Sequence, residues 1–131
     1  MSNFGAVPTA ILTAIGNAVT LGGSRDGFIS YSKIPPDQFP FAMVYNPSKE
    51  HERGEFQHGV ETTANPVLVV WHGATIATVN AGIVAIEAQI KSDPTLSSVV
   101  EDAWVSLAGR DEGLDSEFTA AVLVIDTRMS V

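Results

Sequence analysis

The sequence predicts an α+β fold, in which two helices cover a mostly antiparallel sheet of about five strands in the order α-β-β-β-α-β-β. Two segments place apolar residues at helical spacing, and several apolar or aromatic runs have the length of strands. The chain has 131 residues, a length that suits one hydrophobic core and is too short for two. We therefore expect residues 1–131 to form a single domain.

The first element is predicted to be a helix over residues 7–19. Pro8 fits its first turn, where the missing N–H costs nothing, and Gly22 and Gly23 are suited to ending it. Residues 1–24 carry no charged side chain, so this helix can enter the core without desolvating an ion. Its apolar residues recur every four positions, at Val7, Ile11, Ile15 and Val19.

Five strands are predicted from apolar composition. Residues 28–31 and 39–45 are rich in aromatic side chains and are separated by Pro35-Pro36, which blocks both helix and sheet pairing. The β-branched run at 67–71 is typical of a central strand, with Pro66 at its start. Two final strands, 99–108 and 118–128, flank the acidic turn 109–117 and are expected to form an antiparallel pair.

The second helix is predicted to start near Ile76 and to end at Asp93-Pro94. One face carries the stripe Ile76, Val79, Ile83, Ile86 and Ile90, which we expect to lie on the sheet. A second face carries only small side chains, which allow another backbone to approach closely, either that of the first helix or that of a neighbouring subunit. These candidate subunit contacts are Ala77, Ala81, Ala85 and Ala88.

Residues 46–63 form a polar, charged segment between two predicted strands. A segment of this length in so small a domain is more often functional than idle, so we expect a protruding loop or hairpin that contributes little to the core and contacts a partner. Glu61 is expected to be exposed with the other charges of this segment. The candidate contact residues are Glu50, Glu52, Arg53 and Glu55.

Composition excludes several classes of function. Acidic residues outnumber basic ones by 15 to 7, a net charge of -8, which argues against tight binding to nucleic acid or to an anionic membrane surface. The absence of cysteine excludes disulfides, thiolate nucleophiles and Cys-ligated metals. No apolar run approaches the roughly 18–20 residues that cross a bilayer, and no basic segment precedes the first apolar residues, so we expect no membrane association.

No arrangement of residues in the sequence supports catalysis. His51-Glu52 lacks the second histidine of a zinc-protease helix, and His72 has neither a nucleophile nor an orienting acid beside it in the chain. We therefore predict a protein that is not an enzyme and that carries no cofactor or metal. One alternative is a small metal- or ligand-binding module that recruits His51, His58 or His72. In its metal-binding form, His51 and His58 meet Glu55 across a hairpin.

Parts of the chain resemble the tail terminator and neck (tail completion) proteins of long-tailed bacteriophages. The residues that carry the resemblance are the helix end Ile90-Lys91-Ser92-Asp93-Pro94-Thr95-Leu96, the strand opening Val99-Val100 and the closing run Ala121-Val122-Leu123-Val124-Ile125. The order of the predicted elements is similar as well.

The resemblance implies a structural virion assembly protein, a homohexameric ring that terminates the tail tube and joins it to the head-completion protein. The implied partners are further copies of the chain, the tail tube protein and the head-completion protein, with DNA passing through the ring without specific binding. The implied location is the tail or neck of a virion, after synthesis in the host cytoplasm. An alternative within the same class is another neck or tail-tube subunit that acts in head–tail joining.

Overall fold

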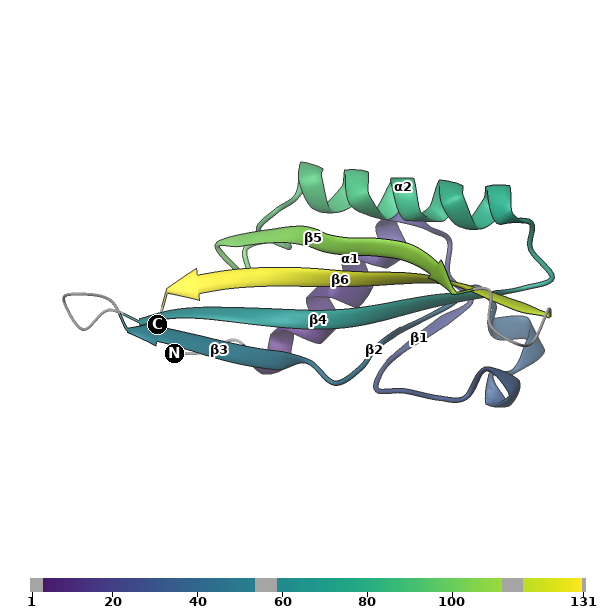
Figure 1. The fold of residues 1–131 in the computed structure, drawn as a ribbon, viewed down its shortest axis with the longest axis horizontal. Coiled ribbons are helices and arrows are strands. Elements are labelled where there is room, and N and C mark those ends of the chain that lie inside the picture. Colours follow the sequence, from purple (N-terminus) through teal and green to yellow (C-terminus); the bar gives the residue numbers. More distant parts are fainter. Residues whose placement is uncertain (1–3, 54–58, 112–116, 131) are drawn as a thin grey trace.

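The computed structural model describes residues 4–53, 59–111 and 117–130 (Figure 1). The predicted α+β class is confirmed, because the described residues form two α-helices on one face of a mostly antiparallel six-stranded sheet. The sheet order is β1-β2-β4-β6-β5, and β3 pairs with β4 beyond β2. The elements are α1 (Val7–Ala18), β1 (Gly23–Asp26), β2 (Phe41–Val44), β3 (Ser48–Arg53), β4 (Gly59–His72), α2 (Ile76–Ser92), β5 (Asp102–Asp111) and β6 (Phe118–Ser130).

Helix α1 ends one residue before its predicted end and buries the predicted face. Val7, Ile11 and Ile15 are fully buried in the main core, which lies between the helices and the sheet. The chain then reverses at Gly22, where a Cβ atom would stand only 2.5 Å from the carbonyl carbon of Gln38. This close backbone approach requires glycine and sets the position of β1 beside β2.

The predicted strand at 28–31 is wrong. The strand forms earlier, at β1, which pairs in parallel with β2. After Gly27, whose φ is +129°, residues 28–40 cross the sheet face opposite the helices and include two short 3-10 helices, Tyr31–Lys33 and Pro36–Gln38. The aromatic side chains of this segment cover one end of that face instead of pairing in the sheet. Beneath them lies a second, smaller core of Ile34, Phe41, Met43, Leu68, Val70 and Ala120.

The polar segment 46–63 contains a β-hairpin, since β3 pairs with the first half of β4. Strand β4 is therefore much longer than the predicted 67–71, and it pairs with β6 from Val60–Ser130 to His72–Phe118. Its side chains alternate between the two faces, which buries Glu61 and Thr63 on the helix side. The expectation that Glu61 is exposed is wrong, because strand pairing and alternation continue through the polar residues, although none of residues 46–63 belongs to the two hydrophobic clusters.

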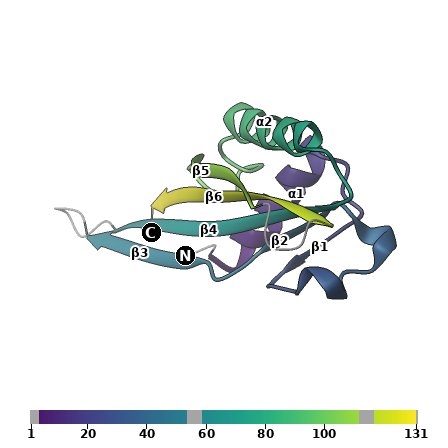
Figure 2. The same ribbon diagram turned by 45° about the vertical axis from the view of Figure 1, so that its right-hand side comes forward.

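Helix α2 packs along β5 and β6, while α1 crosses the strands on the same side of the sheet (Figures 1 and 2). The predicted apolar stripe of α2 is confirmed at Val79, Ile83, Ile86 and Ile90, which are all buried. Ile76 is an exception, 49% exposed, because it is the first residue of the helix. Thr75 caps this end by accepting a hydrogen bond from the Thr78 N–H at 3.3 Å.

The last two strands form the predicted antiparallel pair, but β5 begins at Asp102 instead of Val99. The delay comes from a left-handed turn after α2, in which Leu96, Ser97 and Ser98 have φ between 49° and 72°. The Asp93 carboxylate stabilises this turn by accepting the Ser97 backbone N–H at 3.0 Å. β6, the last strand in the sequence, lies between β4 and β5 in the sheet.

Candidate functional site

The two faces of the sheet differ in how they are covered. Both helices lie on one face, and residues 28–40 cover only one end of the other, which we call the open face. Trp104 is 40% exposed there, and Leu107, which pairs with Val124, is 54% exposed. The open face therefore exposes more than one large apolar side chain to solvent. Several such side chains on one face indicate an interaction surface more often than a single exposed residue does.

A cavity of about 660 Å³ opens at the covered end of this face, and we call it the aromatic pocket. Two aromatic pairs flank it: Phe28 and Tyr45 meet edge to face with ring centroids 6.1 Å apart, and Tyr31 and Phe118 do so at 5.9 Å. The described residues that line it are Phe28, Ser30, Tyr31, Ser32, Tyr45, Leu68, Asp111, Phe118 and Val122.

Tyr31 is the polar group most affected by this setting. Partial burial raises its pKa to about 12, and the negative charge of Asp111, which also accepts a hydrogen bond from the phenol, adds to the effect. Tyr31 therefore stays a neutral hydrogen-bond donor at physiological pH, and Asp111 supplies the negative charge of the pocket. The sequence alone does not reveal this pocket, because its described walls come from five separate segments of the chain.

The predicted subunit contacts on α2 lie on the outer side of the helix. Ala77, Ala81 and Ala88 are exposed, and Ala85 is half-buried. Val84, which was not predicted, lies between Ala81 and Ala88 on the same helical face and is 64% exposed. In the single chain this surface therefore remains open to a second molecule.

The predicted contacts in the hairpin are distributed along β3. Glu50 is exposed and lines a small cavity of about 250 Å³ on the open face together with Trp104 and Asp126. Glu52 and Arg53 occupy the end of β3, opposite Val60 and Gly59. Glu55 lies outside the described residues.

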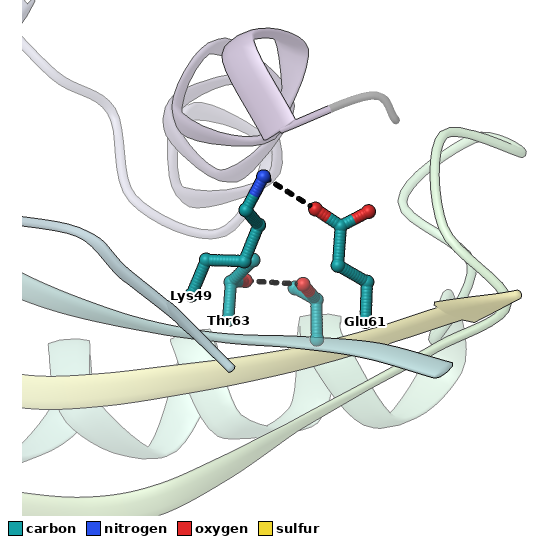
Figure 3. A network of polar contacts seen from close by, with 4 residues as sticks. Lys49, Glu61 and Thr63 are labelled. Carbon is teal, nitrogen blue, oxygen red and sulfur yellow. Dashed lines mark hydrogen bonds and ion pairs between the residues drawn. The ribbon is translucent and has the colours of Figure 1, made fainter. Parts of the chain in front are cut away.

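On the helix side, the same hairpin contains a buried polar row that the sequence analysis missed. The Lys49 ammonium lies 2.9 Å from the Glu61 carboxylate, which is 2% exposed. Figure 3 shows both side chains rising from adjacent strands toward the N-terminal helical segment, residues 4–18, which consists of a short 3-10 helix (Phe4–Ala6) and α1. Thr63 hydrogen-bonds Thr127 of β6, and the Asn65 side-chain amide donates to Thr63 Oγ1 at 2.8 Å. The β-branched pair Thr62-Thr63 was the available signal for this extension of β4.

The histidines do not come together at a described site. His51 lies in β3, and His58 is outside the described residues. The His72 ring packs against Phe39 and Phe118, with its Nε2 3.9 Å from the exposed Glu117 carboxylate, so the acid that the local sequence lacked comes from another segment. Within residues 4–53, 59–111 and 117–130, no three His, Asp or Glu side chains are placed to hold a metal ion.

No helix in the described part of the chain has the length and apolar character needed to span a membrane.

The fold and its surfaces define a class of small α+β domain, with an antiparallel sheet covered by helices on one face and largely open on the other. No family model matches the chain, and no curated protein matches its sequence. The fold is similar to that of a chain in the virion of the native gene transfer agent (GTA) particle, with a TM-score of 0.62 and 10% sequence identity. The match covers 95% of this chain and 94% of that chain, so the two share a fold over nearly their whole length.

Proposed function

We propose that this chain is a structural protein of a phage-like virion and that it assembles into a ring at the end of the tail tube, which it terminates and joins to the head-completion protein. The observation that carries the proposal is the likeness to a chain of the gene transfer agent virion over 95% of this sequence. The resemblance of segments 90–96, 99–100 and 121–125 to tail terminator and neck proteins supports the position in the particle.

The arrangement of apolar surface supports association between copies. The outer face of α2 exposes Val84 and Ala81, and the open face exposes Trp104 and Leu107 on the other side of the sheet. Two unlike apolar surfaces on one molecule favour head-to-tail contacts, which generate closed rings when the rotation between copies closes. The net charge of -8 suits a ring through which DNA passes, because an acidic wall does not hold phosphate.

The proposal is tested by the particles that the pure protein forms. We expect multi-angle light scattering to give the mass of a hexamer and negative-stain electron microscopy to show annular particles. Added to polymerising tail tube protein, the chain should stop growth and be found at one end of the tube. Incorporation along the whole tube would instead identify a tube subunit, and a monomer at high concentration that never binds a tube would overturn the assembly role.

A further inference from the structure

The outer edge of β5 has no strand beside it in the described part of the chain. β5 is the last strand of the sheet order and pairs only with β6. Between Asp102 and Val105, no backbone hydrogen bond from another described segment reaches this edge. Backbone N–H and C=O groups along an open strand edge are a template for pairing with a strand of another chain. The sheet can therefore accept one more strand here.

A cavity of about 400 Å³ lies at this edge, and we call it the edge groove. Four consecutive residues of β5, Asp102–Val105, line it. Because successive side chains point to opposite faces, a cavity that contacts all four lies at the edge of the strand. Glu87, Ile90 and Lys91 of α2 form the other wall. Val84, which is 64% exposed, lies on the same side of α2, at helical spacing from Glu87 and Lys91.

The same sheet has a second open edge at β3, which pairs only with β4 among the described residues. The register places this edge level with the edge groove. Asp102 lies opposite Arg128 of β6, which lies opposite Thr62 of β4. Thr62 in turn lies opposite Glu50 of β3. β5, β6, β4 and β3 alternate in direction, so β3 of a second copy in the same orientation would meet the edge groove as an antiparallel strand, the more stable kind of pair.

The edge of β1 fits the edge groove less well. Through β2, β4 and β6, the register places β1 level with residues 108–111 of β5. The ladder between β5 and β6 is irregular between Val105 and Leu107, which separates that part of β5 from the edge groove. Such an irregularity bends the strand, so it limits a regular new ladder to the residues before it.

We propose that β3 of one copy pairs with Asp102–Val105 of the next copy in the edge groove, so that the sheet continues from copy to copy. The inference rests on the proposed function, for which it names the contact within the ring. Copies in a closed ring are related by rotation without translation, which suits two edges that lie at the same level.

Charge at this contact differs from the net charge of the chain. β3 has the sequence SKEHER, with two cations and two anions. Glu50 of the arriving strand would lie on the same face as Asp102 of the receiving copy. Arg128, which is next to Asp102 in the register, is placed to compensate both carboxylates. The net charge of -8 therefore does not prevent pairing at these two edges.

Chemical cross-linking tests the contact, since the chain has no cysteine of its own. The double variant Asp102→Cys/Glu50→Cys places one thiol on each edge. Within one copy the two positions are three strand spacings apart, about 14 Å, which exceeds the reach of a short bis-maleimide. We expect this reagent to give a ladder of covalent species from dimer to hexamer on a denaturing gel. Each single variant should give no covalent dimer.

The matched control is Asp102→Cys/Asp26→Cys, in which the second thiol is on the exposed edge of β1 and no ladder is expected. A ladder from this control alone would place β1 in the edge groove and overturn the proposal. Covalent dimers from Asp102→Cys alone would mean that β5 pairs with β5 and would also overturn it.

The same experiment separates this contact from the ring itself. Annular particles without a ladder would overturn the contact and leave the proposed function standing. A ladder without annular particles would support the contact and refute the ring. No covalent species in any variant would leave the edge groove to a strand of a different protein and overturn the proposal.

Hydrogen exchange of the unchanged protein tests the contact without a substitution. Assembly should slow exchange at least about tenfold for those amides of β3 and of Asp102–Val105 that do not already bond within the sheet. The amides of Ser24–Asp26 on the edge of β1 should keep their rate. Equal rates for Asp102–Val105 in the single chain and in the assembled particle would overturn the proposal.

Discussion

Lys49 and Glu61 show how a charged pair is accommodated beneath the N-terminal helical segment. A buried carboxylate is costly unless a cation and hydrogen bonds compensate it, and the Lys49 ammonium lies 2.9 Å away. We expect Lys49→Met to lower the free energy of unfolding in urea by about 1–3 kcal/mol, because Glu61 stays buried without this cation.

The exposed Lys33 provides the control for this change. Lys33→Met should alter stability by less than about 0.5 kcal/mol. The double variant Lys49→Met/Glu61→Met should recover much of the loss, since apolar side chains often replace a buried ion pair without cost. Equal effects of Lys49→Met and Lys33→Met would show that the pair does not stabilise the hairpin.

Tyr31 makes the free energy of unfolding depend on pH in the alkaline range. Its pKa in the folded protein is about 12 against an ordinary value of 10.0, so the folded state holds the phenol proton more tightly than the unfolded state does. Its contribution is fully present below pH 10 and is lost as the pH rises toward 12.

The variant Tyr31→Phe should therefore lose less stability than the unchanged protein between neutral pH and pH 11, which urea unfolding at each pH measures. Identical pH profiles for the two proteins would contradict the shift of the Tyr31 pKa.

At the scale of elements, two helical glycines have opposite roles. A Cβ atom on Gly82 would lie 2.7 Å from Cη2 of the buried Trp71, whereas a Cβ atom on Gly16 would meet only Leu21 Cδ1 at 3.9 Å. We expect Gly82→Ala to destabilise the protein by about 1–3 kcal/mol through overpacking. Gly16→Ala should stabilise it by about 0.5–1 kcal/mol, since alanine favours helix. Thermal unfolding followed by circular dichroism measures both, and a stabilising Gly82→Ala would refute the close packing of α2 on Trp71.

The elements that could be predicted from sequence are those with local signals. Both helices follow from apolar spacing and from Gly and Pro at their ends, and the run at 67–71 marks the centre of β4. β1 and β3 have the sequences GSRD and SKEHER, which lack strand propensity and become strands by pairing with β2 and β4. Residues 28–31 have strand composition, but their aromatic rings cover the sheet instead.

The candidate site also contains one part that could be predicted from the sequence and one part that could not. The small residues of α2 were predictable from helical spacing, because an amphipathic pattern shows which side faces the core. The aromatic pocket was not, because Tyr31, Leu68, Asp111 and Phe118 meet only after the sheet has formed. The exposure of Trp104 and Leu107 likewise depends on residues 28–40 covering only one end of the open face.

At the scale of the whole molecule, the proposed ring makes Val84 a sensitive position. Val84→Glu places a charge on an exposed apolar surface, so it should abolish higher oligomers in light scattering while changing the free energy of unfolding by less than about 0.5 kcal/mol. The control is Asn17→Glu, the same added charge at an exposed position of α1, which should leave assembly intact. Normal oligomers in Val84→Glu would exclude the outer face of α2 from the interface.

The central position of β6 affects the time that the chain needs to fold. Pairing β4 with β6 joins Val60 to Ser130, with α2 and β5 in the loop between them. Closing this loop costs conformational entropy before the contacts between β4 and β6 form and compensate for it. We therefore expect refolding in milliseconds to seconds, measured by stopped-flow fluorescence. The apolar residues at the centre of β4 stay without their main partner until this step. Unfolded chains are therefore most prone to aggregate at that strand, and a fragment that ends before residue 118 cannot build the middle of the sheet.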